Sequence, residues 1–558
     1  MRRRRGILIS ALAALSAIVL SACAGLPSSG PVNEGLSANE EGGAPDLSFI
    51  PDRPQPGATP EEIVEGFIRA GSGPAGGWSR AFEFLAPGTE WNPNAGVIID
   101  VSSERDPSAV DSDSVTMTVA TVATVDDRGA YEPSEGGTTP LPFELALQSD
   151  GEWRITDAPD GIVLDRDVFT SVFRKYSLMY FDPTWTYLVP DVRWFATTNI
   201  ATRITDALVN KPRSEWLAES VGTAFPDEVT ASPAVPVASG RAEVTLSNEA
   251  GGVDQTALNR MQTQLEASLA GAGITSVDML VGNASLSAET VITRRTTVTG
   301  PPLVQIEQGF GFLVGDDLSS IPGLSEAMDG VPAAAVQVSP NRDAAAVRLT
   351  EGTSVRVGAD GSLAEVDSRA DLVDPSIDPQ GVIWSVPRSN PQSVIARLPD
   401  GRVIQIAEAW PDATHIDAMV VSRDGARIAA LVTSGGRTAV WIAGVVRGPD
   451  MMAPTRLSDP ILLGAVVGTG VGLAWLDDTT VGVLSSDAES TLVLEQLIGG
   501  PGAPAAGPDG VTSIAGGSNI SSVRLRGADG KIYVKRGANW QETVSDVLVL
   551  ATQQGMPE

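Results

Sequence analysis

The spacing of hydrophobic residues changes along the chain, and the first folded region that it defines covers residues 59–165. Thr59-Pro60-Glu61-Glu62 is typical of a helix start, because Thr59 can act as the N-cap and Glu62 can complete a capping box. An apolar helix face follows at Ile63, Val64, Phe67 and Ile68. Later segments alternate with the period of two that a strand requires, at residues 115–119 and 143–147, and residues 151–155 are typical of a hairpin turn that enters another strand. Helices followed by strands predict a small α+β domain.

A second helix and strand pattern covers residues 196–295. Apolar residues at the helical spacing i, i+4, i+8 occupy residues 200–208, and an alternating strand follows at residues 241–246. Asp254 is a good N-cap for a longer helix that ends at Gly271, and residues 274–281 form the next strand. This alternation predicts a second small α+β domain with a mixed sheet.

Between these regions, residues 166–195 form a connector that is dense in aromatic side chains, including Trp185 and Trp194. Large aromatic side chains bury much apolar area and often join adjoining domains, which is the interpretation we favour. A sugar-binding or protein-binding surface is the alternative.

Long helices are absent from the pattern of residues 300–555, where short apolar strands and turn residues recur. Aligning the repeats on residues 339, 378, 422, 475 and 527 gives spacings of 39, 44, 53 and 52 residues. A four-stranded propeller blade needs roughly 40–50 residues, and Asp-Gly turns suit its hairpins. The five repeats and one unit before residue 339 predict about six blades. A β-sandwich is the alternative, but sandwiches rarely show so long a period. The predicted fold is therefore multidomain: two small α+β domains followed by an all-β propeller-like domain.

The first 22 residues have the order of a secretory signal peptide, with basic, apolar and small residues in succession. Arg2–Arg5 precede an apolar run of about 14 residues, which is shorter than the roughly 20 residues of a membrane-spanning helix. Leu20-Ser21-Ala22-Cys23 then resembles the lipobox of bacterial lipoproteins. This predicts recognition by signal peptidase at Leu20, Ser21 and Ala22, and attachment of diacylglycerol to Cys23. Residues 23–58 are rich in Gly, Pro and Ser and read as a flexible tether.

The formal charge of −31 limits the possible partners. Removing residues 1–22 takes away four arginines and no acidic residue, so the charge becomes −31 − 4 = −35. An acidic chain repels nucleic acid and anionic lipid headgroups, so we expect no nucleic-acid partner, and membrane attachment must come from the acyl chains on Cys23. Cys23 is the single cysteine, so the exported domains cannot contain disulfides.

The sequence contains no recognisable catalytic or cofactor motif. His415 is the sole histidine, which leaves little basis for Ser-His-Asp chemistry and excludes a zinc site built from His and Cys. Gly530-Lys531 is followed by Ile532 and therefore does not belong to a phosphate-binding loop. We expect no enzyme activity, no catalytic residues, no metal and no cofactor.

Taken together, the chain resembles the actinobacterial LpqB lipoprotein family over essentially its whole length. The segments that carry the resemblance are Cys23-Ala24-Gly25-Leu26-Pro27-Ser28-Ser29, Leu178-Met179-Tyr180-Phe181-Asp182-Pro183, Leu188-Val189-Pro190-Asp191 and Thr223-Ala224-Phe225-Pro226. The last segment lies in a region, residues 196–295, that looks like a GerMN domain. The order of an N-terminal module, a GerMN domain and a propeller is the most specific part of the match.

The resemblance implies an extracytoplasmic, lipid-anchored protein of the cell membrane. It also implies that the protein binds the extracytoplasmic domain of an MtrB-like sensor histidine kinase and modulates two-component signalling that affects cell division and cell-wall homeostasis. The residues that contact this partner are not evident from the sequence. One alternative is a cell-wall glycan binder or peptidoglycan hydrolase that uses the propeller face or the aromatic connector, where Trp185 or Trp194 would contribute to binding. A scaffold without regulatory output is another.

Overall fold

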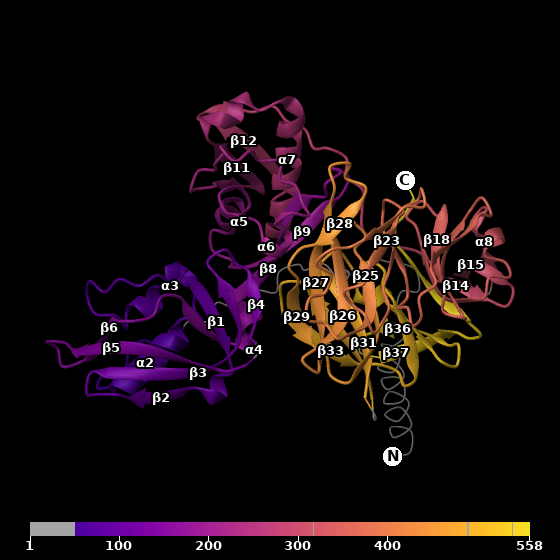
Figure 1. Cartoon of the computed structure of the whole chain (residues 1–558). Helices are drawn as coiled ribbons and strands as arrows, with labels where there is room; N and C mark the ends of the chain where they lie inside the picture. The colour runs from indigo at the N-terminus through magenta and orange to yellow at the C-terminus, as the bar shows by residue number, and fades with distance from the viewer. Residues whose placement is uncertain (1–50, 135, 316, 488–489, 538, 558) are drawn as a thin grey trace, which may run out of the picture. The chain divides into compact units, whose positions relative to one another are not determined.

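The computed structural model describes residues 51–134, 136–315, 317–487, 490–537 and 539–557, which belong to one compact unit. Two regions that mix helices and strands precede a larger region built almost wholly of strands (Figure 1). The predicted fold class, with α+β domains followed by an all-β domain, is confirmed.

The first α+β region packs helix α2 (Pro60–Ala70) on a sheet that is antiparallel except for one pair of strands. The predicted capping box forms, because the Glu62 N–H donates to the Thr59 side chain and the Thr59 N–H donates to the Glu62 carboxylate. The strands lie in the order β6-β5-β3-β1-β7, with β1 and β7 parallel. The remaining bounds are α3 (Ala75–Phe82), β1 (Gly96–Asp100), β2 (Asp106–Ala109), β3 (Ser114–Asp126), β4 (Tyr131–Pro133), β5 (Thr138–Leu147), β6 (Trp153–Asp157) and β7 (Ile162–Asp165).

The aromatic connector folds into helix α4 (Arg166–Val172) and a hairpin of β8 (Phe173–Phe181) and β9 (Leu188–Ala196). Its buried aromatic side chains divide between two cores. Phe169, Phe173 and Trp194 pack in the core of the first region. Tyr176, Tyr180, Phe181 and Phe195 pack in the core of the region that follows. The hairpin therefore joins two domains through its side chains, in agreement with the favoured interpretation of the sequence.

The second α+β region contains the predicted mixed sheet, in which β11 pairs parallel with β12 and antiparallel strands flank both. Asp254 caps helix α7 by accepting a hydrogen bond from the Ala257 N–H. The helix ends at Leu269, and Gly273, rather than Gly271, adopts the left-handed conformation that stops it. The bounds are α5 (Ile200–Val209), α6 (Glu215–Ala218), β10 (Val237–Ala238), β11 (Arg241–Leu246), α7 (Gln255–Leu269), β12 (Ser276–Val281) and β13 (Ala284–Ser285).

The all-β region forms six antiparallel blades within the part of the chain that the structure describes. The first three blades use β14 (Leu303–Ile306), β15 (Gly309–Val314), β16 (Asp317–Ser319), β17 (Ala333–Val338), β18 (Ala344–Leu349), β19 (Ser354–Gly358), β20 (Leu363–Asp367), β21 (Ser376–Ile377), β22 (Ile383–Ser385), β23 (Ile395–Arg397) and β24 (Val403–Gln405), with short helix α8 (Leu324–Ala327) between β16 and β17. The others use β25 (His415–Val421), β26 (Arg427–Ser434), β27 (Arg437–Arg447), β28 (Pro454–Leu457), β29 (Ile461–Ala465), β30 (Thr469–Trp475), β31 (Thr480–Ser486), β32 (Thr491–Leu497), β33 (Gly502–Ala506), β34 (Val511–Ala515), β35 (Arg524–Gly527), β36 (Ile532–Arg536) and β37 (Asn539–Val544).

The C-terminal strand β38 (Val549–Gln553) closes the ring of blades. It pairs antiparallel with β14, so the blade that β14 begins is completed by the end of the chain. The inner strands β38, β17, β21, β25, β30 and β34 contact one another in this order, and β34 contacts β38 again. The region is therefore a β-propeller whose first and last strands share one blade.

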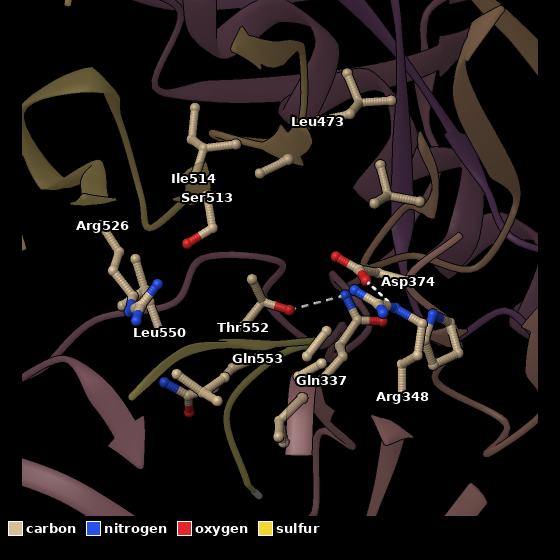
Figure 2. A pocket seen from close by; sticks show the side chains of 18 of the residues that line it. Gln337, Arg348, Asp374, Leu473, Ser513, Ile514, Arg526, Leu550, Thr552 and Gln553 are labelled. Carbon is tan, nitrogen blue, oxygen red and sulfur yellow. Dashed lines mark hydrogen bonds and ion pairs between the residues drawn. The ribbon is translucent and has the colours of Figure 1, made fainter. Parts of the chain in front are cut away.

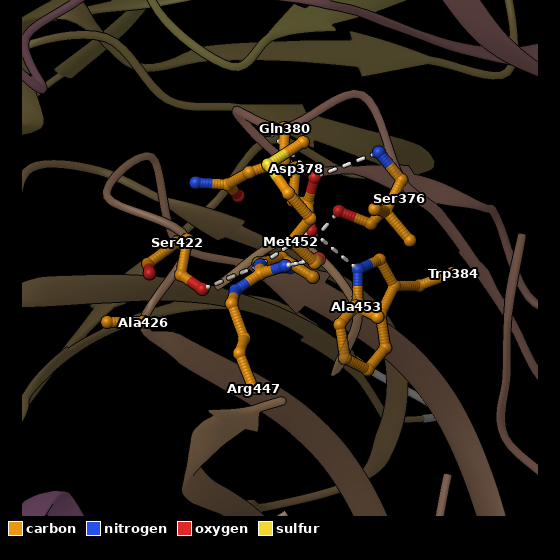
Figure 3. A network of polar contacts seen from close by, with 12 residues as sticks. Ser376, Asp378, Gln380, Trp384, Ser422, Ala426, Arg447, Met452 and Ala453 are labelled. Carbon is orange, nitrogen blue, oxygen red and sulfur yellow. Dashed lines mark hydrogen bonds and ion pairs between the residues drawn. The ribbon is translucent and has the colours of Figure 1, made fainter. Parts of the chain in front are cut away.

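Buried polar side chains hold the turns that lead from an inner strand to the next strand of its blade. In the third blade, Asp378 accepts hydrogen bonds from the Val382 N–H and from Trp384 Nε1, and it forms an ion pair of 2.7 Å with Arg447 (Figure 3). In the next blade, the Ser422 hydroxyl donates to Asp424. These turns coincide with the repeats at residues 339, 378 and 422.

The repeat placed at residue 527 is out of phase with the others. Residues 527–530 form the β35–β36 turn, whereas the other repeats mark the turn one strand earlier in the blade. The assignment was wrong because Gly530, like Gly425, has positive φ, so an Asp-Gly turn fits any hairpin of a blade.

Candidate functional site

A cavity of about 280 Å³ lies in the channel that the inner strands enclose (Figure 2). Its lining combines polar and apolar side chains from several blades, among them Gln337, Val420, Leu473, Ser513, Leu550 and Thr552. Gln337 fastens the strands beside it, because its Nε2 donates to Thr552 and its Oε1 accepts from the Ser376 hydroxyl and the Ile377 N–H. Rigid inner strands therefore position the wall of the cavity.

One end of the cavity carries two arginines and is accessible to solvent. Arg348 Nε donates to Asp374 at 2.7 Å, and the Asp374 side chain is 61% exposed. Arg526 donates to the Val547 carbonyl at 2.8 Å and to Thr512 Oγ1 at 3.4 Å, and it forms no ion pair with a described residue. Figure 2 shows Arg526 on one side and the Arg348–Asp374 pair on the other, with Thr552 between them. Burial lowers the pKa of Arg526, yet an arginine stays charged at neutral pH.

A buried cation lies at the opposite end. Arg423, which is 5% exposed, donates hydrogen bonds of 3.2, 2.6 and 2.9 Å to the carbonyl oxygens of Thr296, Gly517 and Trp475. Burial lowers the pKa of Arg423 to about 10, so the guanidinium remains charged at neutral pH. Gln554 Nε2 donates to the Val421 carbonyl at 3.0 Å beside it. Arg423 and Gln554 therefore place buried polar groups in the lining where the inner strands β25 and β38 end.

One polar group in the wall lacks a partner among the described residues. Gln553 Oε1 is buried and accepts no hydrogen bond. Ser513, which also lines the cavity, lies opposite Arg526 in the β34–β35 ladder. An unpaired buried acceptor is costly, so it marks a place where a ligand or a water can donate.

The residues singled out in the sequence lie elsewhere. Leu20, Ser21, Ala22 and Cys23 are outside the described residues. The His415 side chain is 43% exposed and lies 3.3 Å from Asp417, outside the cavity lining. Within the described ranges, no group of three or more His, Cys, Asp or Glu side chains could hold a metal ion.

The two tryptophans of the glycan hypothesis are not free platforms. Trp194 is 4% exposed, and its Nε1 donates to the Gly499 carbonyl of the propeller at 2.8 Å. Trp185 is only partly buried, but Arg260 covers its ring at 4.0 Å from the centroid. Trp194 therefore offers no open face for a sugar, and one face of Trp185 is covered.

The channel arginines could not have been found from the sequence. Arg423 stands inside a recognised repeat, Ser422-Arg423-Asp424-Gly425, but nothing in that repeat shows that it faces the channel. Arg348 and Arg526 lie far apart in the sequence and line one cavity only through the closure of the ring.

These features define a multidomain protein with a C-terminal β-propeller and a cationic channel. Three family models match it: the N-terminal domain of lipoprotein LpqB at residues 53–170, the Germane domain of sporulation and spore germination at residues 177–287, and the LpqB β-propeller domain at residues 303–549. The chain belongs to the LpqB lipoprotein family.

Curated relatives agree with this assignment. The chain is 31% identical over 222 residues to lipoprotein LpqB of Mycolicibacterium smegmatis, which covers 38% of this chain and 36% of the relative. It is 30% identical over 269 residues to lipoprotein LpqB of Thermobifida fusca, which covers 45% and 42% of the two chains. The alignments thus span well under two thirds of the relatives' length.

Among solved structures, TolB from Acinetobacter baumannii matches 45% of this chain and 66% of its own at 13% identity, with a TM-score of 0.33. So low a score carries no argument, and the propeller assignment rests on strand pairing and on the family model. No helix in the described part of the chain combines the length and hydropathy of a membrane span.

Proposed function

We propose that this protein is an envelope lipoprotein that binds the extracytoplasmic domain of an MtrB-like sensor histidine kinase. Binding modulates two-component signalling that affects cell division and cell-wall homeostasis. Diacylglycerol on Cys23 holds the protein on the outer face of the cell membrane, and its role is binding without catalysis. The choice of a sensor kinase as the partner rests on the resemblance to the LpqB family.

The observation that best supports this role is the direct bonding between the propeller and the domains before it. The Ser458 hydroxyl donates to the Trp216 carbonyl at 2.5 Å, and Arg427 donates to the Pro190 carbonyl at 3.4 Å. Domains bonded in this way present a continuous, preorganised surface, which lowers the entropic cost of binding a macromolecule. The surface shifts the kinase between signalling states only if it prefers one of them.

The proposal is tested by titrating the purified full chain in detergent against the kinase ectodomain, with binding measured by biolayer interferometry. Saturable binding is expected, and the autophosphorylation rate of the full-length kinase should change when both proteins share one vesicle. Absence of binding at high ectodomain concentration would contradict the proposal.

Cys23→Ala separates anchoring from recognition. We expect this variant to leave the membrane fraction and to lose its effect on kinase in vesicles, because the anchor supplies the local concentration. Its affinity for the soluble ectodomain should match that of the native chain. A variant that stayed on the membrane would refute the role of Cys23.

A further inference from the structure

We propose that the propeller channel binds a peptide carboxylate, either the C-terminal carboxylate of a peptide or an acidic side chain, together with the amide N–H and the apolar group beside it. This inference does not depend on the identity of the proposed kinase partner.

The charge of the channel is opposite to that of the whole chain. The formal charge is −31, yet three arginines, Arg348, Arg423 and Arg526, line the cavity, and Asp374 is the only carboxylate among its described lining residues. Outside the lining, Asp477 and Asp478 act electrostatically on Arg423, and Asp529 acts on Arg526. A cleft that is lined by charges of one sign and has low-dielectric walls concentrates ions of the opposite charge. An acidic protein with this channel therefore attracts an anion to one defined place.

Two of these cations are available to an anion. Arg526 bonds only neutral oxygens, those of Val547 and Thr512. Arg423 likewise bonds only carbonyl oxygens, through three hydrogen bonds from Nη1 and Nη2. A guanidinium in this state can form a charge-assisted hydrogen bond to a carboxylate without breaking an ion pair.

The rest of the wall decides between a peptide and a simple inorganic anion. Gln553 Oε1 needs a donor, which a peptide N–H supplies and a bare anion at the arginines does not. Leu473, Ile514 and Leu550 add an apolar surface that suits an aliphatic side chain. The volume of about 280 Å³ suits one or two residues and not a folded domain.

The direction of entry follows from the two ends. Asp374, Thr512 and Leu548 are exposed at one end, whereas Arg423 and Gln554 are buried at the other. A ligand must therefore enter past Arg348 and Arg526 with its tip toward Arg423, as the end of a chain or a projecting side chain can do.

Isothermal titration of the full chain in detergent with four short peptides tests the proposal. N-acetyl-alanyl-leucyl-alanine carries a free C-terminal carboxylate. The same peptide with an amidated C-terminus has no carboxylate and is its neutral partner. N-acetyl-alanyl-aspartyl-alanine amide carries only a side-chain carboxylate. The same peptide with asparagine in place of aspartate has no carboxylate and is its neutral partner. At least one carboxylate peptide should bind about tenfold or more tightly than its neutral partner, and the pair that does so identifies the source. Equal binding within both pairs, or no binding at 10 mM peptide, overturns the proposal.

Variants locate the site. Arg526→Gln and Gln553→Leu should each weaken binding about tenfold. Ser513→Asp should abolish it, because the new carboxylate would face Arg526 in the ladder. The control Arg437→Gln removes the same charge from the exposed tip of the β26–β27 hairpin and should leave affinity unchanged.

Circular dichroism identifies variants that fold. Native affinity in folded Ser513→Asp, or displacement of the peptide by equimolar inorganic phosphate, overturns the proposal. No kinase is present, so failure here leaves the proposed function untouched.

Discussion

At the residue scale, the propeller depends on carboxylates that are buried together with their cations. The Asp378 and Arg447 side chains are 0% and 1% exposed, and those of Asp424 and Arg427 are each 1% exposed. Removing one partner from such a pair leaves an uncompensated charge in the interior, which costs far more than the pair contributes when intact. These residues are therefore sensitive positions although they lie outside the channel.

Asp378→Ala should lower the free energy of unfolding of the propeller by about 3–5 kcal/mol, because Arg447 loses its carboxylate and Trp384 Nε1 loses its acceptor. Urea denaturation followed by tryptophan fluorescence measures this change. Asp400→Ala is the control, since Asp400 and Arg402 form a solvent-exposed pair and the change should be negligible. Equal effects of the two substitutions would contradict the prediction.

The pH dependence of stability should report on Asp367. Burial raises the pKa of its carboxyl, but hydrogen bonds from Arg369 and Ser385 and the charge of Arg369 outweigh burial and lower it. A folded-state pKa below the unfolded one means stability that is present above about pH 4 and is lost as the pH falls through the folded pKa.

Asp367→Asn should therefore destabilise the protein by roughly 1–2 kcal/mol at pH 7, with the difference from the native chain shrinking below about pH 4. Urea unfolding at several pH values measures it, and Asp509→Asn at an exposed turn position serves as control. If the stability difference between the variant and the native chain grew toward acid pH, the prediction of a lowered pKa for Asp367 would be wrong.

At the element scale, β38 joins the two ends of the propeller. Its backbone pairs with β14 on one side and with β17 on the other, and Val549, Leu550 and Ala551 are buried. The other blades take consecutive strands, so closure at this blade depends on a long-range pairing. Such a pairing is slow to form but fixes the ring once it is made.

Deleting residues 546–558 should abolish the cooperative unfolding of the propeller, because the loss exposes two hydrophobic clusters and is comparable with the 5–15 kcal/mol that stabilise a typical domain. Near-ultraviolet circular dichroism and limited proteolysis are the measurements. Deleting only residues 557–558 removes no part of β38 and should preserve the transition. Resistance of the larger deletion to protease would contradict this role.

At the scale of the whole molecule, Trp194 is one of the side chains that connect the first region to the propeller, together with contacts of β4 with β29 and of Leu497 with the first core. The Trp194 ring packs against Phe169 with centroids 4.7 Å apart, and its Nε1 binds the Gly499 carbonyl. It therefore stabilises both a domain core and the contact between domains.

Trp194→Ala should cost about 3–5 kcal/mol and should separate the unfolding of the first region from that of the propeller into two calorimetric transitions. Differential scanning calorimetry measures both effects. The control is Trp185→Ala, which removes a ring that packs on Phe181 and Arg260 and makes no propeller contact of this kind. A single transition in Trp194→Ala would refute the coupling.

Local periodicity was enough to predict much of this fold. Several features depend on residues that are close in sequence and can therefore be predicted from local patterns. They are the capping box at Thr59, the Asp254 cap, the mixed sheet and the meander of about six blades. The lipobox at Cys23 is likewise a local signal, and it remains a prediction from the sequence alone.

Only the tertiary structure decided the rest. The phase of the last blade, the closure by β38 and the meeting of Arg348, Arg423 and Arg526 in one channel depend on residues that are distant in sequence. Arg348 and Arg526 are 526 − 348 = 178 positions apart, and no spacing rule reaches so far. The pattern of a strand predicts which of its faces is apolar. Packing of the whole ring decides which strands become neighbours, and therefore which side chains share a cavity.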